Sequence, residues 1–399
     1  MSTRRRTTGH RVEEATKLTS VVGDRTKHWK PHWTSWIRTA FIVTCAAALL
    51  IAIYWKRTLN QVPHQLIPPE PHDNDDIDPA FTVRDLPGRG KGMIAVRDIR
   101  RGELLLRERP LILVPREIET SPSQLISDLV QQLSPDQIAS FHNLSHVELP
   151  GNISPEQRQL AIFQTNAVGA GSNVGLFPTM ARLNHGCSGA FNSVYSWRER
   201  EGVLVVHALK DINKGEELLT AYFGTRQTRD VRRHYLKQKY DFHCMCAYCA
   251  LPDEESKASD TKLTAMNDLY NRFSTWGNGA IDGREAIRVA KRIWAIGEEE
   301  GYVSERGRLA ADAVLVAAAH AEYVPGVVYR VAGNFTEYVY SAEAAVDWAR
   351  LALRWASYEL GSDSDLAEEM RITMQEPKGH IMWGQRQAMR VGKPSEGDD

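Results

Sequence analysis

The sequence predicts an α+β protein in which short strands are followed by helices. Up to about residue 225, apolar residues gather in short runs such as VLVVHAL, which is typical of strands joined by irregular connections. From about residue 253, apolar residues recur at spacings of three and four, which indicates amphipathic helices. Gly88, Gly90 and Gly92 do not fit G-x-G-x-x-G and no helix pattern follows them, so we do not expect a dinucleotide-binding fold.

Length and charge limit the possible function classes. The chain has 399 residues, of which 42% are hydrophobic, and this is enough for two packed domains. Its 49 Lys and Arg residues nearly balance 50 Asp and Glu residues, so charge gives no basis for direct nucleic-acid binding. Five cysteines do not form the framework of a secreted disulfide scaffold. We expect a monomer that does not contact nucleic acid.

A segment near the N-terminus resembles a membrane span. Residues 39–55 read TAFIVTCAAALLIAIYW, seventeen residues without a charge, between Arg38 and Lys56. A helix of this length covers roughly 25 Å, the short end of what a bilayer needs. A buried helix and a signal peptide are the alternatives, but no small-residue cleavage site follows the apolar run. We therefore expect a single-pass transmembrane helix between a basic disordered tail, residues 1–38, and an acidic proline-containing linker, residues 56–80.

The orientation of this predicted span follows from the charges that flank it. The basic excess before the span favours a cytoplasmic N-terminus, which would place the larger domain on the lumenal side. Glycosylation-type triplets at Asn143, Asn152 and Asn334 agree weakly with this orientation, since such triplets are common by chance.

Three of the five cysteines are close together in the segment DFHCMCAYC. Cys244, Cys246 and Cys249 fall within six residues, a density typical of a metal site. Structural zinc almost always takes four ligands. Cys45 lies inside the predicted membrane span, so Cys187 is the remaining cysteine that could complete the set. The sequence therefore predicts a four-thiolate zinc site.

Two alternatives to this ligand set stay open at the level of sequence. The cysteines could form two disulfides, although the Cys-x-Cys spacing disfavours this on geometry. His234 or His243 could replace Cys187 as a ligand. A site that includes Cys187 would join two segments about sixty residues apart and would offset the entropy of ordering the loop between them.

Four motifs follow one another in an order that resembles a known family. The segment GRGKGMIAVRDIRRGELLLRE has a strand-turn-strand pattern, and RLNHGC, GEELLTAY and FHCMCAYC come after it. Together they resemble SET-domain lysine methyltransferases with a post-SET zinc site, and the layout is most similar to the SET/MYND branch and related fungal proteins. The insert after Pro115 holds no cysteine, so the MYND finger of that branch is absent.

The resemblance implies a domain order. A SET domain is expected at residues 81–225, with a helical insert at 116–165 that has Ser-Pro helix starts, and a post-SET zinc region at 226–252. Residues 253–390 are expected to form a helical C-terminal domain in which Trp348 and Trp355 belong to the core between helices, and residues 391–399 a disordered tail.

The resemblance also implies that the protein binds S-adenosylmethionine and zinc. The glycine-rich turn would lay its backbone against the methyl donor, because glycine allows close approach and positive φ. An aromatic side chain just before the clustered cysteines would pack on the adenine, so that zinc positions one wall of the pocket. The residues that match the cofactor-binding positions of the family are Arg89, Gly90, Lys91, Gly92, Asn166, Asn184, His185 and Phe242.

Two tyrosines match the reaction centre of the family. Tyr222 would lie beside the transferred methyl group, and Tyr240 would line the lysine channel. Deprotonating a lysine of pKa near 10.4 at pH 7 costs about 4.6 kcal/mol, and both an apolar channel and a nearby sulfonium reduce this cost. One departure affects the motif, since Gly186 and SGAFN stand where the family has serine and then an early proline and asparagine, which displaces Asn192.

Two function classes follow from these observations. We expect an S-adenosylmethionine-dependent protein-lysine N-methyltransferase that acts on a histone or another protein. The alternative is a non-catalytic, membrane-tethered SET scaffold, which need not bind the methyl donor. Methyl transfer and reduced thiolates suit a domain that faces the cytosol or nucleus. The charges that flank the predicted span favour the opposite, lumenal side, so the sequence leaves the side of the membrane open.

Overall fold

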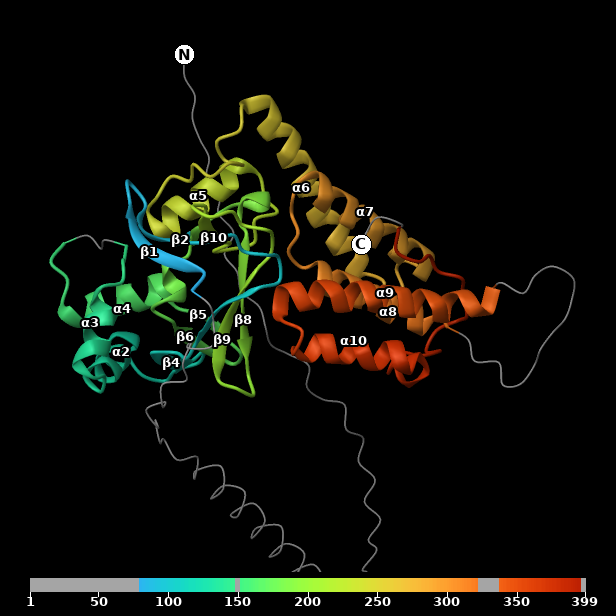
Figure 1. The fold of residues 1–399 in the computed structure, drawn as a ribbon, viewed down its shortest axis with the longest axis horizontal. Helices are drawn as coiled ribbons and strands as arrows, with labels where there is room; N and C mark the ends of the chain where they lie inside the picture. Colours follow the sequence, from blue (N-terminus) through green and yellow to red (C-terminus); the bar gives the residue numbers. More distant parts are fainter. Residues whose placement is uncertain (1–78, 148–150, 322–336, 396–399) are drawn as a thin grey trace, which may run out of the picture. The chain divides into compact units, whose positions relative to one another are not determined.

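The computed structural model in Figure 1 describes residues 79–147, 151–321 and 337–395, all within the unit that spans residues 69–399. The predicted tail 1–38, the predicted span 39–55, nearly all of the linker and Asn334 lie outside the described residues. Across the part that is described, no helix has both the length and the apolar character that a membrane span requires. The anchor at residues 39–55 stays a prediction.

The first half of the described chain forms ten short strands in three sheets. Their orders are β1-β2-β10-β7, β3-β9-β8 and β4-β6-β5, and Figure 1 shows the strands as short arrows. The strands are β1 Phe81–Leu86, β2 Gly90–Ala95, β3 Leu104–Glu108, β4 Ile112–Pro115, β5 Val168–Ala170, β6 Asn173–Leu176, β7 Asn184–His185, β8 Ser193–Arg198, β9 Val203–Ala208 and β10 Glu217–Thr220. The predicted α+β class with short strands is confirmed.

One parallel pairing brings two distant motifs together. Strand β10 pairs antiparallel with β2 but parallel with β7, where Leu219 lies opposite Asn184 and Thr220 opposite His185. The other strand pairs are antiparallel. Because Tyr222 follows directly after β10, this pairing places it beside the Asn-His motif. Buried apolar residues that include Met93, Phe177 and Leu204 fill the core of this region.

The insert between β4 and β5 is helical in its described residues, as the Ser-Pro starts predict. It contains α2 Pro122–Gln131, α3 Pro135–His142 and α4 Pro155–Asn166. Ser134 and Ser154 each form a reciprocal capping box with the glutamine three residues later, which satisfies backbone N–H groups at the helix start. A core that includes Ile126, Phe141 and Ile162 packs these helices together. Helix α4 ends at Asn166, so the insert delivers this residue to the site.

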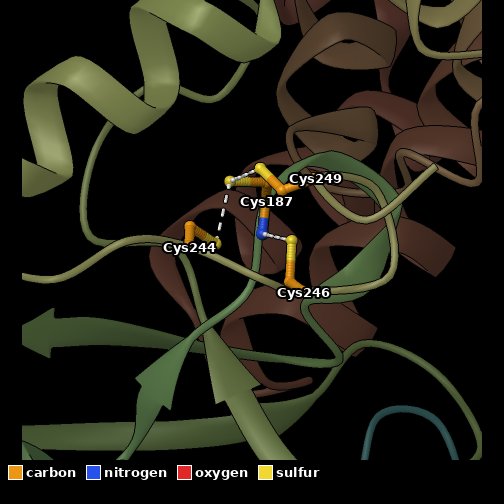
Figure 2. A group of neighbouring side chains, drawn as sticks. All are labelled: Cys187, Cys244, Cys246 and Cys249. Carbon is orange, nitrogen blue, oxygen red and sulfur yellow. Dashed lines mark hydrogen bonds between the residues drawn. The ribbon is translucent and has the colours of Figure 1, made fainter. Parts of the chain in front are cut away.

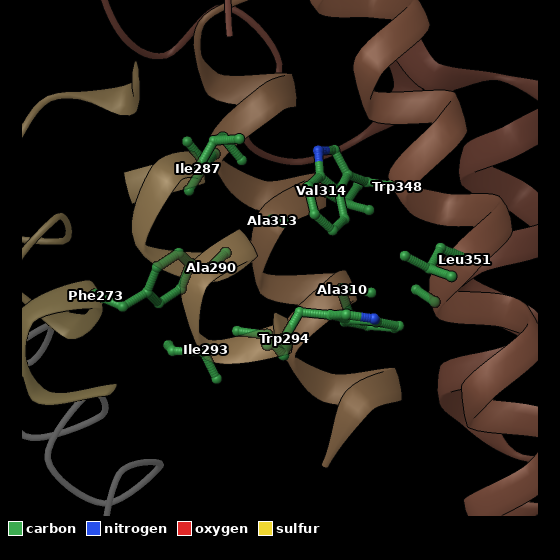
Figure 3. Close-up of a cluster of buried hydrophobic side chains, with 14 of the residues drawn as sticks. Phe273, Ile287, Ala290, Ile293, Trp294, Ala310, Ala313, Val314, Trp348 and Leu351 are labelled. Atoms are coloured by element: carbon green, nitrogen blue, oxygen red, sulfur yellow. The ribbon is translucent and has the colours of Figure 1, made fainter. Parts of the chain in front are cut away.

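The second half of the described chain is helical. After α5 Arg229–Tyr240 come α6 Asp253–Ser274, α7 Gly283–Glu299, α8 Arg306–Ala319, α9 Glu337–Leu360 and α10 Asp365–Gln375. The tryptophans predicted to lie between helices are buried, and Figure 3 shows Trp294 and Trp348 beside the small alanine side chains of α8. Small side chains let helices approach closely, which accounts for the alanine-rich sequence of α8 and α9.

The ordered chain extends further than the sequence predicts. A disordered tail is expected from residue 391, but Val391 is buried against the helical core. The indole of Trp348 donates to the carbonyl oxygen of Gly392 at 2.9 Å, and Lys393 forms ion pairs with Glu343 and Asp347. The prediction failed because one buried valine, one hydrogen bond and two ion pairs leave no periodic signal in so short a segment.

Candidate active site and metal centre

The four cysteines that the sequence singles out come together in the structure. Their sulfur atoms all lie within 4.8 Å of one another, and Figure 2 shows them converging on one point. Cys187 reaches the cluster from the turn after β7, while Cys244, Cys246 and Cys249 come from the loop after α5. Three of the four residues are buried, and Cys246 is partly exposed.

The spacing of the sulfurs fits a tetrahedral zinc site better than disulfides. Four sulfurs bound to zinc at about 2.3 Å lie about 3.8 Å apart. The sulfur of Cys187 is 3.9 Å from that of Cys244 and 3.6 Å from that of Cys249. A disulfide needs about 2.05 Å, and none of these four cysteines is bonded in this way. Neither His234 nor His243 belongs to the group of ligand atoms.

A buried arginine supplies positive charge beside the cluster. Arg232 of α5 is fully buried, and its Nε and Nη2 atoms have no conventional hydrogen-bond acceptor. Burial by itself lowers the pKa of Arg232, but the sulfurs of Cys187 and Cys249 raise it above its ordinary value. Nη1 of Arg232 forms an ion pair with Asp260 at 3.2 Å. Four thiolates around one zinc ion carry a net charge of about −2, so the remaining Nε and Nη2 donors fit this donor set. Sequence reasoning missed Arg232.

His185 links the cluster to the predicted catalytic tyrosine. Its Nδ1 accepts a hydrogen bond from the backbone N–H of Tyr222 at 3.1 Å, and its Nε2 lies 3.0 Å from the sulfur of Cys187. Burial lowers the pKa of His185 to about 4. A neutral ring whose Nδ1 accepts must carry its proton on Nε2, so His185 donates to the Cys187 sulfur.

A pocket of about 610 Å³ adjoins the cluster, and its lining contains most of the predicted site. No Asp or Glu lies among its lining residues. Seven of the eight residues assigned to the cofactor line it, together with both predicted tyrosines. These are Arg89, Gly90, Lys91, Asn166, Asn184, His185, Phe242, Tyr222 and Tyr240.

Gly92, the eighth predicted cofactor residue, is not part of the lining. A Cβ at this position would lie 2.8 Å from Nδ2 of Asn184 and 2.8 Å from Oε1 of Glu217. The Asn184 amide uses this space to donate to the backbone oxygen of Lys91 at 3.2 Å and to Glu217 at 2.8 Å. Gly92 therefore affects the pocket indirectly, because it leaves room for the amide of Asn184. By contrast, Gly90 has φ +68° in the turn that bounds the pocket, a conformation that favours glycine.

The turn that precedes Asn184 is fixed by a half-buried carboxylate. Glu108 at the end of β3 accepts hydrogen bonds from the backbone N–H groups of Thr179 and Met180, each at 2.8 Å. Burial raises the pKa of Glu108, although these hydrogen bonds oppose the shift. They hold the start of the 3₁₀ turn Met180–Arg182, which leads directly into the Asn-His motif.

A second, narrower pocket of about 60 Å³ adjoins the first. Three tyrosines line it, because Tyr195 of β8 joins Tyr222 and Tyr240. The rings of Tyr222 and Tyr240 are 4.9 Å apart between centroids. Five residues line both pockets, namely Thr165, Asn166, Ala181, Tyr222 and Tyr240. Sequence reasoning missed Tyr195, since one tyrosine in a strand gives no signal of its own.

Hydrogen bonding and burial set the state of the two predicted tyrosines. The hydroxyl of Tyr222 donates to the backbone oxygen of Leu183 at 2.8 Å. Burial, with a smaller contribution from Tyr240, raises the pKa of Tyr222, and burial raises the pKa of Tyr240 to about 12. Both side chains are therefore neutral phenols at neutral pH.

The altered loop after the Asn-His motif still binds the neighbouring strand. The Asn192 amide donates to the backbone oxygen of Glu217 at 2.9 Å and accepts from the backbone N–H of Leu219 at 2.8 Å. A Cβ at Gly186 would lie 2.9 Å from the backbone nitrogen of Phe191, so glycine allows the close turn. The displaced asparagine thus holds β10, the strand that leads to Tyr222.

Comparison with known proteins agrees with this geometry. Residues 90–223 match the family model described as SET domain, which confirms the predicted resemblance. The histone-lysine N-methyltransferase set5 of Schizosaccharomyces pombe is 29% identical over 222 residues, which are 55% of this chain and 66% of that protein. The histone-lysine N-methyltransferase SMYD3 of Homo sapiens is 34% identical over 83 residues, 21% of this chain and 18% of that protein.

The chain thus spans less than two thirds of each of these relatives. A solved structure of the SET domain of LSMT bound to lysine and AdoHcy also aligns with this chain. The alignment covers 76% of this chain and 88% of the LSMT chain, with 10% sequence identity and a TM-score of 0.30.

Proposed function

We propose that the protein is an S-adenosylmethionine-dependent protein-lysine N-methyltransferase. The observation that carries this proposal is the meeting of two pockets at Tyr222 and Tyr240. The larger, about 610 Å³, has the size of a typical small-molecule site, while the smaller, about 60 Å³, suits a slender side chain. The SET domain and the names of the relatives support the same reaction.

We assign the larger pocket to the methyl donor. S-adenosylmethionine, when bound, supplies a sulfonium methyl group that is already activated for displacement. The aromatic ring of Phe242 provides a face for the adenine, and the Asn-His motif provides backbone groups. Asn184 is fixed on two sides, by the Lys91 backbone and by Glu217, so it meets a ligand in one orientation.

We assign the narrow pocket to the substrate lysine. Its lining residues carry no charged side chain and include the apolar Met180 and Leu183, so the pocket disfavours an ammonium ion and lowers the pKa of a lysine that enters it. Neither Tyr222 nor Tyr240 can act as a phenolate base near pH 7, because the pKa of each is raised. The proton must therefore leave the lysine for solvent before methyl transfer.

Tyr222 orients the amine in this proposal. Its hydroxyl hydrogen is donated to the Leu183 carbonyl, so the oxygen lone pairs are free to accept from the lysine N–H groups. An amine held in this way keeps its nitrogen lone pair available for in-line attack at about 3 Å. Tyr240 restricts the amine from the side, 4.9 Å from Tyr222 between ring centroids.

Cys187, Cys244, Cys246 and Cys249 would hold a zinc ion with a structural role. Four protein thiolates leave no open coordination position, so such a site supports folding rather than catalysis. It would fix Phe242, two residues before Cys244, and it would fix Tyr222 through His185. The metal would therefore connect the adenine side of the pocket with the reaction centre.

The substrate is proposed as a protein lysine, on a histone or another protein. Two relatives carry the name histone-lysine N-methyltransferase, and this part of the proposal extends that name to the present chain. The membrane anchor at residues 39–55, the side of the membrane, the monomeric state and the lack of nucleic-acid contact stay predictions from the sequence.

Transfer of a radiolabelled methyl group from S-adenosylmethionine to a proteome extract tests the proposal. We expect labelled protein bands whose hydrolysate contains methyllysine, and at least tenfold less label when Tyr222→Phe replaces the wild type. A parallel titration with S-adenosylmethionine separates the enzyme from the scaffold alternative, which need not bind the donor. Wild-type protein that retains zinc but neither binds the donor nor labels any protein would refute the methyltransferase proposal.

A further inference from the structure

Three basic side chains line the larger pocket, and two of them have acidic partners. Arg89 forms an ion pair with Glu217, and Lys91 with Asp85 at 3.1 Å. The third, Arg182, is only 9% exposed and has no acidic partner in the described part of the chain. The pocket therefore contains one buried cation without a counter-charge.

The position of Arg182 leaves part of its guanidinium available to a ligand. Its Nη2 donates to the backbone oxygen of Asn143 at 3.2 Å, and this is its one polar contact within the described residues. A guanidinium has five N–H donors in a planar fork that matches a carboxylate. A buried charge without a partner is costly, so a ligand that brings a carboxylate would be favoured here.

An acceptor from a neighbouring element lines the same pocket. Asn166 uses its amide nitrogen to donate to the backbone oxygens of Ser145 and Ile162, each at 2.7 Å. Both amide hydrogens are then occupied, and Oδ1 remains as an acceptor with no partner in residues that the structure describes. Arg182 and Asn166 are held by the same segment, through Asn143 and Ser145.

This combination of a cation and an acceptor fits the amino acid end of the donor. An α-amino acid presents a carboxylate and an ammonium on one carbon atom, so it needs both kinds of group close together. The family resemblance already places Asn166 at the amino acid end of the donor, where its Oδ1 can accept from the α-ammonium. We infer that Arg182 is the counter-ion of the α-carboxylate of S-adenosylmethionine at the same end. This inference rests on the proposed function, and it makes Arg182 the residue that selects donors carrying a carboxylate.

The test compares two donors that differ only in the carboxylate. The full chain, reduced and supplied with zinc, is titrated calorimetrically with S-adenosylmethionine and with decarboxylated S-adenosylmethionine. We expect the wild type to bind S-adenosylmethionine roughly ten- to a hundredfold more tightly, the range of a hydrogen-bonded charge pair. Arg182→Gln should remove this preference by lowering the affinity for S-adenosylmethionine alone, and Arg182→Lys should restore part of the preference.

Decarboxylated donor also reports whether the Arg182→Gln variant is folded, because its affinity should stay unchanged. Arg200→Gln is the matched control, since the Arg200 side chain is 84% exposed and lines neither pocket. If Arg182→Gln keeps the wild-type preference, or loses affinity for both donors equally, the inference is wrong while the methyltransferase proposal stands. If the wild type binds neither donor, both are wrong.

Discussion

The backbone N–H of Tyr222 donates a hydrogen bond to Nδ1 of His185 across 3.1 Å, although the two residues are 37 positions apart in the chain. The parallel pairing of β7 with β10 makes this contact possible. The second nitrogen of the same imidazole reaches the sulfur of Cys187 at 3.0 Å. One ring therefore connects the cysteine cluster to the proposed reaction centre, so a change in the metal site should alter the position of Tyr222.

Replacing a cysteine of the cluster tests this connection. Cys249→Ser removes one of four thiolates, so we expect zinc content to fall well below one ion per chain, and donor affinity to fall with it. Elemental analysis and donor titration measure the two effects. Cys45→Ser is the control, since Cys45 is the fifth cysteine and belongs to the predicted membrane span rather than to the predicted ligand set. Wild-type protein that carries no zinc, or full donor affinity after the ion is stripped, would contradict the prediction.

Removing the hydroxyl of Tyr222 tests its proposed role in orienting the amine. Tyr222→Phe keeps the ring but loses the oxygen, so we expect methyl transfer to a peptide to fall tenfold or more, about 1.4 kcal/mol in activation free energy. Donor affinity should stay nearly the same. Tyr235→Phe is a suitable control, because Tyr235 is 39% exposed and lines neither pocket. Unchanged turnover in Tyr222→Phe would remove this residue from the mechanism.

Enlarging the narrow pocket should change the product. Tyr195 lines this pocket and not the larger one, so Tyr195→Ala makes room near the amine without altering the donor site. A lysine that already carries a methyl group should then fit and react again. We expect mass spectrometry of a peptide substrate to show a higher ratio of di- and trimethyllysine to monomethyllysine. An unchanged ratio in an active variant would mean that Tyr195 does not limit the space.

A buried carboxyl group that lines neither pocket predicts how stability depends on pH. Glu359 of α9 accepts a hydrogen bond from the backbone N–H of Arg306 at 2.9 Å, and burial raises the pKa of Glu359 to about 8 from an ordinary value near 4.5. Between these values the folded state holds a proton that the unfolded state releases, so rising pH favours unfolding. The stabilising contribution is full below about pH 4.5 and is lost as pH rises through about 8.

Urea unfolding between about pH 6 and pH 9 checks this sign. The wild type should lose free energy of unfolding as pH rises, and Glu359→Gln, which keeps an acceptor but cannot ionise, should show a flatter dependence. Glu368→Gln, whose side chain is 60% exposed, controls for the loss of a surface charge. Parallel curves for the wild type and Glu359→Gln would show that Glu359 does not titrate in this range.

Much of the site could be read from the sequence because its residues belong to local motifs. Asn184 and His185 are adjacent, and Tyr222 and Phe242 stand at fixed distances from recognisable segments. Arg232 could not be found in this way, since an arginine in a helix is ordinarily exposed and only packing buries it beside the sulfurs. Arg182 and Tyr195 are equally ordinary in sequence, and only the folded chain places them at the pockets.

The sequence by itself determined which chemical groups are available and where helices begin. Three clustered thiols and a fourth upstream predicted a metal site from ligand number alone, and Ser134 and Ser154 marked helix starts through contacts only three residues long. The tertiary structure decided which side chains are buried away from water and which polar groups are left without a partner. Among the residues that the structure describes, Arg182 became a buried cation without an acidic partner because strands and helices from distant segments enclose it, and a sequence pattern does not record long-range burial.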